Sequence, residues 1–223
     1  MKTILKLFAF LAIFAIGACS KLDVVGNDSV RAFNELLQSS PQLVSKDDAK
    51  GGWSFAAPDG EVRFIWSKNF AESRPYDVML EFDVAPFILA GLELSKLINI
   101  FILKDGKLTV GGKLGNEKIS YKGEATPLAS YQQIVKLRRG SIGYHGQMDH
   151  YGINLGNGNM FEWAKNMATN DKDIVFVLDP SPFIAAGVEP AYIEGWSYTK
   201  VTVDDAYGNP IQVDKILKAF DLK

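Results

Sequence analysis

The two histidines of the chain lie close together in the sequence and are the first candidates for chemistry. His145 and His150 occur in the segment GYHGQMDHY, with Asp149 between them. Imidazole and carboxylate groups are common metal ligands, so this segment could hold a metal ion or a haem. However, residues five apart do not share a helical face, whereas His145 and Asp149 would share one. We therefore favour a loop without a metal, and keep a metal site formed by His145, Asp149 and His150 as the alternative.

A second candidate is a group of one aromatic and two polar residues that occurs twice. At each place a tryptophan is followed by a small residue, a lysine and an asparagine. The residues are Trp66, Lys68 and Asn69, and then Trp163, Lys165 and Asn166. An aromatic ring beside an ammonium and an amide could hold a sugar or a peptide. The other interpretation is that both tryptophans belong to the core, because a position kept at both places is one that the fold requires.

Other catalytic patterns are absent from the sequence. Glu81 and Asp83 lie two apart on a predicted strand, as an acid–base pair would require, but a similar later segment has Val177 in place of Glu81. Asp83 and Asp179 are instead expected to bind backbone N–H groups where a short helix begins. There is no GxSxG elbow, and the glycine-rich segment 110–118 lacks the Lys-Ser/Thr pair of a phosphate loop and is read as a hairpin. We expect no catalytic residue and no cofactor.

The N-terminus has the three parts of a secretory signal. Lys2 and Lys6 supply positive charge, residues 7–16 are uninterrupted apolar residues, and two small residues follow. The apolar run is shorter than the roughly 20 residues that a membrane-spanning helix needs. Residues 1–18 are therefore predicted to be a signal peptide.

The end of this segment, Ile16-Gly17-Ala18-Cys19, resembles the lipobox of bacterial lipoproteins. The resemblance implies that the Cys19 thiol receives a diacylglyceryl group, that the chain is cleaved before Cys19, and that residues 19–28 form a lipidated tether. Two or three acyl chains hold a domain at a membrane almost permanently. Ser20 is not aspartate, which by resemblance to lipoprotein sorting signals favours the outer membrane in a bacterium with two membranes. In a bacterium with one membrane, the domain would lie on its outer face.

The composition is that of a globular domain rather than a nucleic-acid-binding one. The 223 residues carry a net charge of −2 at pH 7, and 47% of them are hydrophobic. Nucleic acids require a concentrated basic face, so we expect no nucleic-acid partner. Cys19 is the one cysteine, so no disulfide can form within the chain. The stability of the folded part must therefore come from its core.

Two pairs of segments indicate an internal duplication. Asp77–Glu93 and Asp173–Glu189 are identical at 8 of 17 positions without a gap. Phe64–Ala71 and Phe161–Ala168 are identical at five of eight. The offset is 96 residues in the first pair and 97 in the second. A period of this length is too long for a solenoid repeat and suits a small domain or half-domain.

Each repeat is predicted to contain a helix, antiparallel strands, a short second helix and further strands, which is an α+β fold. We assign repeat 1 to residues 29–125 and repeat 2 to residues 126–223. In repeat 1, Ser29 is expected to cap the first helix, residues 30–38, because a serine commonly begins a helix. Pro58–Gly60 marks a hairpin. The join between the repeats is too short for a flexible tether, so we expect the two to pack together.

These observations favour a membrane-anchored bacterial lipoprotein. Its duplicated, non-catalytic α+β domain would face the periplasm or the cell exterior, and would bind a small ligand or an envelope protein. The alternative is an anchored metal- or haem-binding protein or enzyme centred on Tyr144–Tyr151. Binding through a surface common to both repeats would use both Trp66 and Trp163, whereas a catalytic centre would be confined to repeat 2.

Overall fold

The computed structural model describes residues 25–70, 74–170, 172–204 and 209–222. The predicted signal peptide, the lipobox-like segment and Cys19 lie outside these ranges. Within them, no helix is both long and apolar enough to cross a membrane.

The elements occur in the same succession in each half of the chain. Residues 25–39 are helical, and they are followed by η1 (Pro41–Leu43), β1 (Val44–Asp47), β2 (Gly52–Ala56), β3 (Val62–Ser67), β4 (Val78–Asp83), α2 (Ala85–Leu89), η2 (Leu94–Lys96), β5 (Ile102–Lys104) and β6 (Lys107–Gly112). The second half contains α3 (Pro127–Leu137), η3 (Arg139–Ser141), β7 (Ile142–His145), β8 (His150–Gly156), β9 (Asn159–Ala164), β10 (Ile174–Leu178), α4 (Ser181–Ala185), η4 (Pro190–Tyr192), β11 (Ser197–Asp204) and β12 (Pro210–Phe220).

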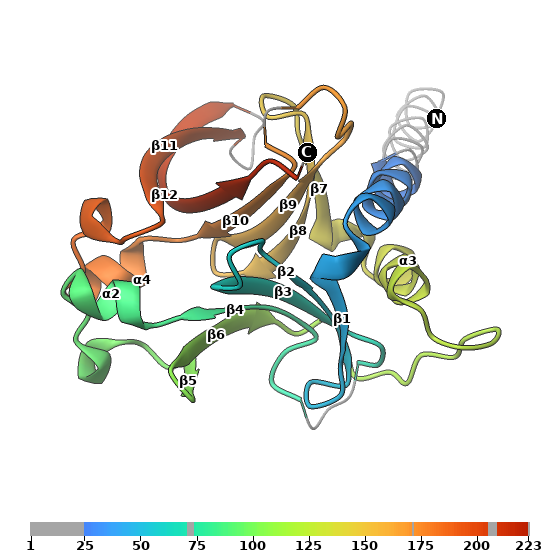
Figure 1. The fold of residues 1–223 in the computed structure, drawn as a ribbon, viewed down its shortest axis with the longest axis horizontal. Coiled ribbons are helices and arrows are strands. Elements are labelled where there is room, and N and C mark those ends of the chain that lie inside the picture. Colours follow the sequence, from blue (N-terminus) through green and yellow to red (C-terminus); the bar gives the residue numbers. More distant parts are fainter. Residues whose placement is uncertain (1–24, 71–73, 171, 205–208, 223) are drawn as a thin grey trace, which may run out of the picture.

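The strands form two six-stranded antiparallel sheets, which confirms the α+β class. The order is β1-β2-β3-β4-β6-β5 in the first sheet and β11-β12-β10-β9-β8-β7 in the second. Read from β7, the second sheet has the same order of strands as the first. In Figure 1 the sheets form two layers, with α2 and α4 at one end and with α3 and the helix of residues 25–39 at the other.

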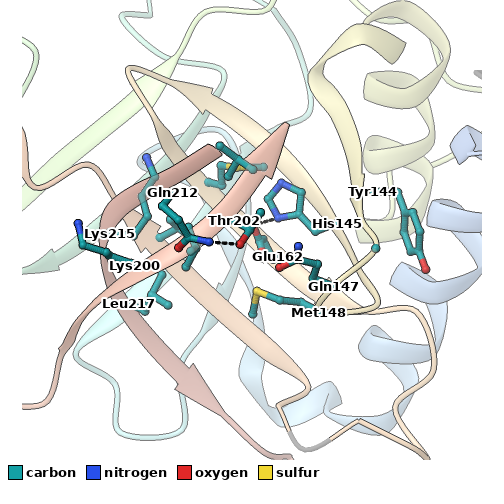
Figure 2. A pocket seen from close by; sticks show the side chains of 15 residues that line it. Tyr144, His145, Gln147, Met148, Glu162, Lys200, Thr202, Gln212, Lys215 and Leu217 are labelled. Atoms are coloured by element: carbon teal, nitrogen blue, oxygen red, sulfur yellow. Dashed lines mark hydrogen bonds and ion pairs between the residues drawn. The ribbon is translucent and has the colours of Figure 1, made fainter. Parts of the chain in front are cut away.

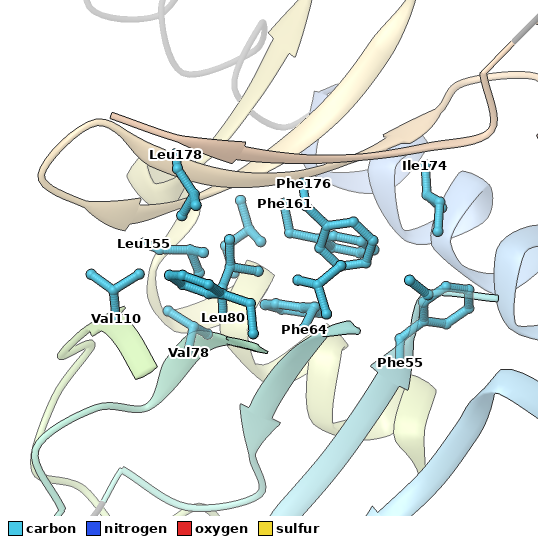
Figure 3. Close-up of a cluster of buried hydrophobic side chains, with 14 of the residues drawn as sticks. Phe55, Phe64, Val78, Leu80, Val110, Leu155, Phe161, Ile174, Phe176 and Leu178 are labelled. Carbon is cyan, nitrogen blue, oxygen red and sulfur yellow. The ribbon is translucent and has the colours of Figure 1, made fainter. Parts of the chain in front are cut away.

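One hydrophobic core lies between the two sheets and joins both halves of the chain. Side chains alternate between the two faces of a strand, so every second residue points inward. At the centre, the rings of Phe64 on β3 and Phe161 on β9 are stacked, with centroids 4.5 Å apart and an interplanar angle of 9°. Figure 3 shows the apolar side chains of the two sheets meeting in this layer. The expected close packing of the two halves is therefore confirmed.

The two tryptophans lie in this core. Trp66 and Trp163 have no exposed surface. Both rings contact Phe33, with centroids 5.5 and 5.1 Å away, and the Trp66 indole N–H donates to the carbonyl of Pro127 at 3.2 Å. The core interpretation of the tryptophans is confirmed. Their proposed use as a platform for a sugar or a peptide is wrong, because neither ring can be reached from solvent.

At one end of the sandwich, the segments after α2 and α4 bind each other through their backbones. The N–H of Glu93 donates to the carbonyl of Ala186 at 2.8 Å, and the N–H of Glu189 donates to the carbonyl of Ala90 at 2.9 Å. The exchange is reciprocal, so each half supplies one donor and one acceptor to the other. These bonds fix the two short helices side by side (Figure 1).

Two glycines lie at the centre of this contact. Gly91 and Gly187 adopt φ angles of 103° and 95°, and residues that have a Cβ rarely adopt such positive φ angles. A Cβ on Gly91 would come within 2.7 Å of the Gly187 carbonyl oxygen, and a Cβ on Gly187 within 3.0 Å of the Gly91 carbonyl oxygen. The two turns approach closely because both residues lack a side chain.

Three local predictions need correction. Ser29 does not begin its helix, since residues 25–39 are helical and its hydroxyl donates back to the Gly26 carbonyl at 2.8 Å. The predicted boundary at residue 29 therefore falls inside a helix. Residues 110–118 do not form a hairpin: β6 ends at Gly112, and no strand follows before α3 in this described stretch. The N–H groups of Leu114 and Gly115 bind the Asp77 carboxylate instead, at 2.7 and 3.1 Å.

Candidate functional site

A pocket of about 600 Å³ lies on the second sheet, on the face turned away from the shared core. Along β9 the residues alternate: Met160 and Glu162 line the pocket, whereas Phe161 and Trp163 are in the core. The turn between β7 and β8 borders the pocket, and the long hairpin of β11 and β12 curves over it (Figures 1 and 2). A pocket of this volume is large enough for a small organic molecule.

The lining of the pocket combines apolar and polar side chains. The apolar ones are Met148, Met160, Val177, Val201, Val203 and Leu217. The polar ones are Tyr144, His145, Gln147, Glu162, Lys200, Thr202, Gln212 and Lys215. Methionine is unbranched and polarizable, so the two methionines can adapt to ligands of irregular shape.

The apolar part of the floor is a row of three side chains on adjacent strands. Met160 on β9 is paired with Val177 on β10, and Val177 is paired with Leu217 on β12. We call these three residues the apolar row. Because all three line the pocket, an outer sheet face that would ordinarily be polar is here suited to an apolar ligand.

The corresponding strands of the first sheet carry a polar row. Arg63 on β3 is paired with Glu81 on β4, and Glu81 is paired with Thr109 on β6. The Arg63 guanidinium lies 2.6 Å from the Glu81 carboxylate and 3.2 Å from that of Asp47, and the Lys50 ammonium lies 3.3 Å from Glu81. Burial raises the pKa of Glu81, but Arg63 and Lys50 together lower it by more than burial raises it, so the net shift is downward. A cavity of only about 160 Å³ is found beside this row.

At one end of the pocket, both histidines meet Glu162. His145 and His150 are directly opposite each other across the β7–β8 hairpin. Nδ1 of His145 lies 2.9 Å from one carboxylate oxygen of Glu162, and Nδ1 of His150 lies 3.8 Å from the other. The helical-spacing criterion was therefore the wrong test, because residues five apart face each other in a hairpin. The prediction of two loop histidines is also wrong, since both belong to strands.

Glu162 and His150 are almost completely buried, with 2% of each residue exposed. Burial raises the pKa of the Glu162 carboxyl, but its contacts with His145 and His150 lower it more, so its pKa lies below the ordinary value. Glu162 is consequently ionised at neutral pH. Nε2 of His150 lies 2.7 Å from the Lys172 carbonyl, which can only accept, so this nitrogen carries the hydrogen.

Asp149 does not join the histidines. Its carboxylate accepts a hydrogen bond from the Tyr144 hydroxyl at 2.5 Å, which raises the pKa of Tyr144. The Lys165 ammonium lies 3.9 Å from Asp149 and 5.2 Å from the centroid of the Tyr144 ring. Within the described part of the chain, no three His, Cys, Asp or Glu side chains are placed to hold a metal ion. The set His145, Asp149 and His150 is thus not a metal centre in this arrangement.

Among the remaining predicted site residues, Asn69 and Asn166 bind backbone groups through their side chains, and Lys68 does so through its own backbone. The Asn69 side-chain oxygen accepts from the N–H of Ile119 at 3.2 Å, and the Lys68 carbonyl accepts from the Tyr121 hydroxyl at 2.7 Å. The Asn166 side-chain oxygen accepts from the N–H of Ala168 at 3.0 Å. None of these residues lines the pocket.

The carboxylates predicted to bind backbone groups differ from each other. Asp179 accepts from the N–H of Ser181 at 2.8 Å where α4 begins, as expected. Asp83 lies 2.5 Å from the Lys107 ammonium instead, so its main contact is an ion pair.

Glu162 is the site residue that sequence reasoning missed. In the alignment of Phe64–Ala71 with Phe161–Ala168, Glu162 corresponds to Ile65. A charged residue thus replaces an apolar one, and this difference could have indicated the site. Comparisons with protein-family models, with curated proteins and with solved structures found no match.

Proposed function

We propose that this protein is a membrane-anchored bacterial lipoprotein that binds a small, partly apolar ligand in the pocket of the second sheet. The binding domain faces the periplasm or the cell exterior, and binding involves no catalysis. The observation that carries this proposal is the apolar row of Met160, Val177 and Leu217 in a 600 Å³ pocket. An outer sheet face without a ligand has no need of such a row, and the first sheet has a polar row at the same strand positions.

The two halves derive from one duplicated unit in this proposal. The strand orders of the two sheets are the same, and residues matched by the internal alignment contact each other. Such self-contacts are expected along a two-fold axis. The pairs are Phe64 and Phe161 at 4.5 Å between ring centroids, and Phe87 and Phe183 at 4.8 Å.

The experiment that tests ligand binding recreates the ion pair of the first sheet in the second. In the variant Met160→Arg/Val177→Glu, the new side chains occupy the positions that correspond to Arg63 and Glu81. Because the charges are paired, we expect the variant to fold while the pocket floor becomes polar. We expect 1-octanol, an uncharged probe with an apolar chain, to raise the melting temperature of the wild type and to leave that of the variant unchanged.

A matched control is Ile211→Glu. Ile211 is an exposed apolar residue on β12 that does not line the pocket, so this variant should respond to 1-octanol as the wild type does. Equal responses of the wild type and of the double variant would contradict the proposed site. If the melting temperatures of the wild type and of the double variant both stay unchanged, calorimetric titration with 1-octanol measures binding directly. Absence of binding to the wild type in that titration would also contradict the proposed site.

One observation favours a second candidate, an anchored hydrolase. A carboxylate 2.9 Å from Nδ1 of His145 is the arrangement that orients an imidazole as a general base. Release of 4-nitrophenol from 4-nitrophenyl octanoate, with loss of that activity in His145→Asn, would favour the enzyme over the binding protein.

The lipid anchor has its own prediction. Cys19→Ala removes the thiol that would be acylated, so we expect the protein to leave the membrane fraction or to remain unprocessed with its signal peptide. Fractionation and intact-mass measurement of the protein made in a bacterium check this outcome, and Ser20→Ala is the control that should stay anchored. An unchanged mass and an unchanged membrane fraction for Cys19→Ala would exclude lipidation at this residue.

A further inference from the structure

The charges that a ligand would meet in the pocket are basic among the described residues. The side chains of Lys200 and His145 are 66% and 32% exposed, and Lys215 is half-buried. The one acidic residue of the lining, Glu162, has only 2% of its side chain exposed. Its carboxylate is engaged by His145 at 2.9 Å, so it offers little charge to a ligand.

Both lysines line the pocket from the β11–β12 hairpin, Lys200 from β11 and Lys215 from β12, on the side away from His145 (Figure 2). The Lys200 ammonium lies 2.9 Å from the Asp214 carboxylate, and the hydrogen bond and charge of Asp214 raise the pKa of Lys200. The Lys215 ammonium donates to the Gly158 carbonyl at 3.0 Å. An ammonium has three donors, so the contact with Gly158 leaves Lys215 able to bind an anion as well.

Lys215 lies on the same strand as Leu217 of the apolar row, and Lys200 lies on the neighbouring strand β11. Lys215 and Leu217 are two residues apart on β12 and both line the pocket, as the alternation of a strand requires. A molecule that lies along the apolar row can therefore place one polar end beside Lys215, and Lys200 lines the same pocket from the neighbouring strand. The complementary ligand is apolar along its length and negatively charged at one end.

We propose that the ligand is a small amphipathic organic anion, namely an apolar chain or ring that carries one carboxylate. The carboxylate binds Lys215 and Lys200, and the apolar part covers Met160, Val177 and Leu217. This inference rests on the proposed function, because it specifies the ligand of the same pocket.

The test compares three probes that share one chain and differ in charge: octanoate, 1-octanol and octylamine. At about pH 8 octanoate is anionic, 1-octanol is uncharged and octylamine is cationic, and the lysine variants below separate the lysines from His145. We expect calorimetric titration of the purified protein to give at least about tenfold tighter binding of octanoate than of 1-octanol, and the weakest binding for octylamine.

The matched variants remove the positive charge of the two lysines and leave the apolar row of the pocket floor unchanged. In Lys200→Gln/Lys215→Gln, octanoate and 1-octanol should bind with affinities within about twofold of each other. Lys46→Gln on β1, which removes an exposed lysine paired with Asp48, should behave as the wild type does. Glutamine is polar, uncharged and only one atom shorter than lysine, so a general loss of folding is not expected to imitate the result.

The outcomes separate the ligand class from the proposed function. If 1-octanol binds the wild type as tightly as octanoate, or if octylamine binds best, the anionic class is overturned while the pocket stands. If octanoate preference persists in Lys200→Gln/Lys215→Gln, the assigned lysines are wrong. If none of the probes binds and Met160→Arg/Val177→Glu is indistinguishable from the wild type, the proposed function itself is overturned.

Discussion

Replacing Phe161 with alanine is expected to lower the free energy of unfolding by about 3–5 kcal/mol. The ring has no exposed surface and is stacked on Phe64 at a centroid distance of 4.5 Å. It also contacts Phe176 at 5.1 Å and Phe55 at 6.0 Å. Since these neighbours come from both sheets, the cavity left by the substitution cannot be filled by a shift of one strand.

Urea denaturation of the purified protein measures this loss. Phe220→Ala is the control, because Phe220 lies on the same sheet but is only half-buried, and it should cost clearly less. The double variant Phe64→Ala/Phe161→Ala should show a coupling of about 0.5–1.5 kcal/mol between the rings. A loss below about 1 kcal/mol for Phe161→Ala would mean that the two sheets do not share the core described above.

The substitution Gly91→Ala is expected to cost about 2–4 kcal/mol of stability. Two effects add together. The φ angle of 103° is unfavourable for alanine, and the new Cβ would come within 2.7 Å of the Gly187 carbonyl oxygen. The reciprocal backbone bonds around these glycines would then lengthen, so the two short helices would separate.

Gly106→Ala separates the two effects. Gly106 has a φ angle of 75°, but a Cβ there would meet no atom within 4 Å. This control should cost about 1–2 kcal/mol, from backbone strain alone. Thermal and urea denaturation of the two variants give the comparison. Equal losses would show that the close approach between Gly91 and Gly187 makes no separate contribution.

The fold was predictable from sequence wherever local signals were strong. Pro58, Asp59 and Gly60 marked a hairpin that the structure contains between β2 and β3, because proline and glycine favour the required turn. The β7–β8 hairpin was missed. Strand β8 is buried on both faces over most of its length, so its sequence does not alternate between apolar and polar residues.

The candidate site was less predictable because it depends on neighbours that are distant in sequence. The replacement of Glu81 by Val177 was visible, but only strand pairing shows that Met160 and Leu217 flank Val177. Likewise, residues 159–161, which come just before Glu162 on β9, gave no indication that Glu162 lies beside His145. Register between strands is a long-range property, and no local pattern in the sequence specifies it.

The polar row of the first sheet has a consequence for stoichiometry. Arg63 and Glu81, held with Asp47 and Lys50, occupy the face that corresponds to the pocket floor, and the cavity beside them measures about 160 Å³. Of the two corresponding sheet faces, that of the second sheet therefore carries the cavity of adequate size. Titration should saturate at one ligand per chain, and a single chain should show no cooperativity between its halves.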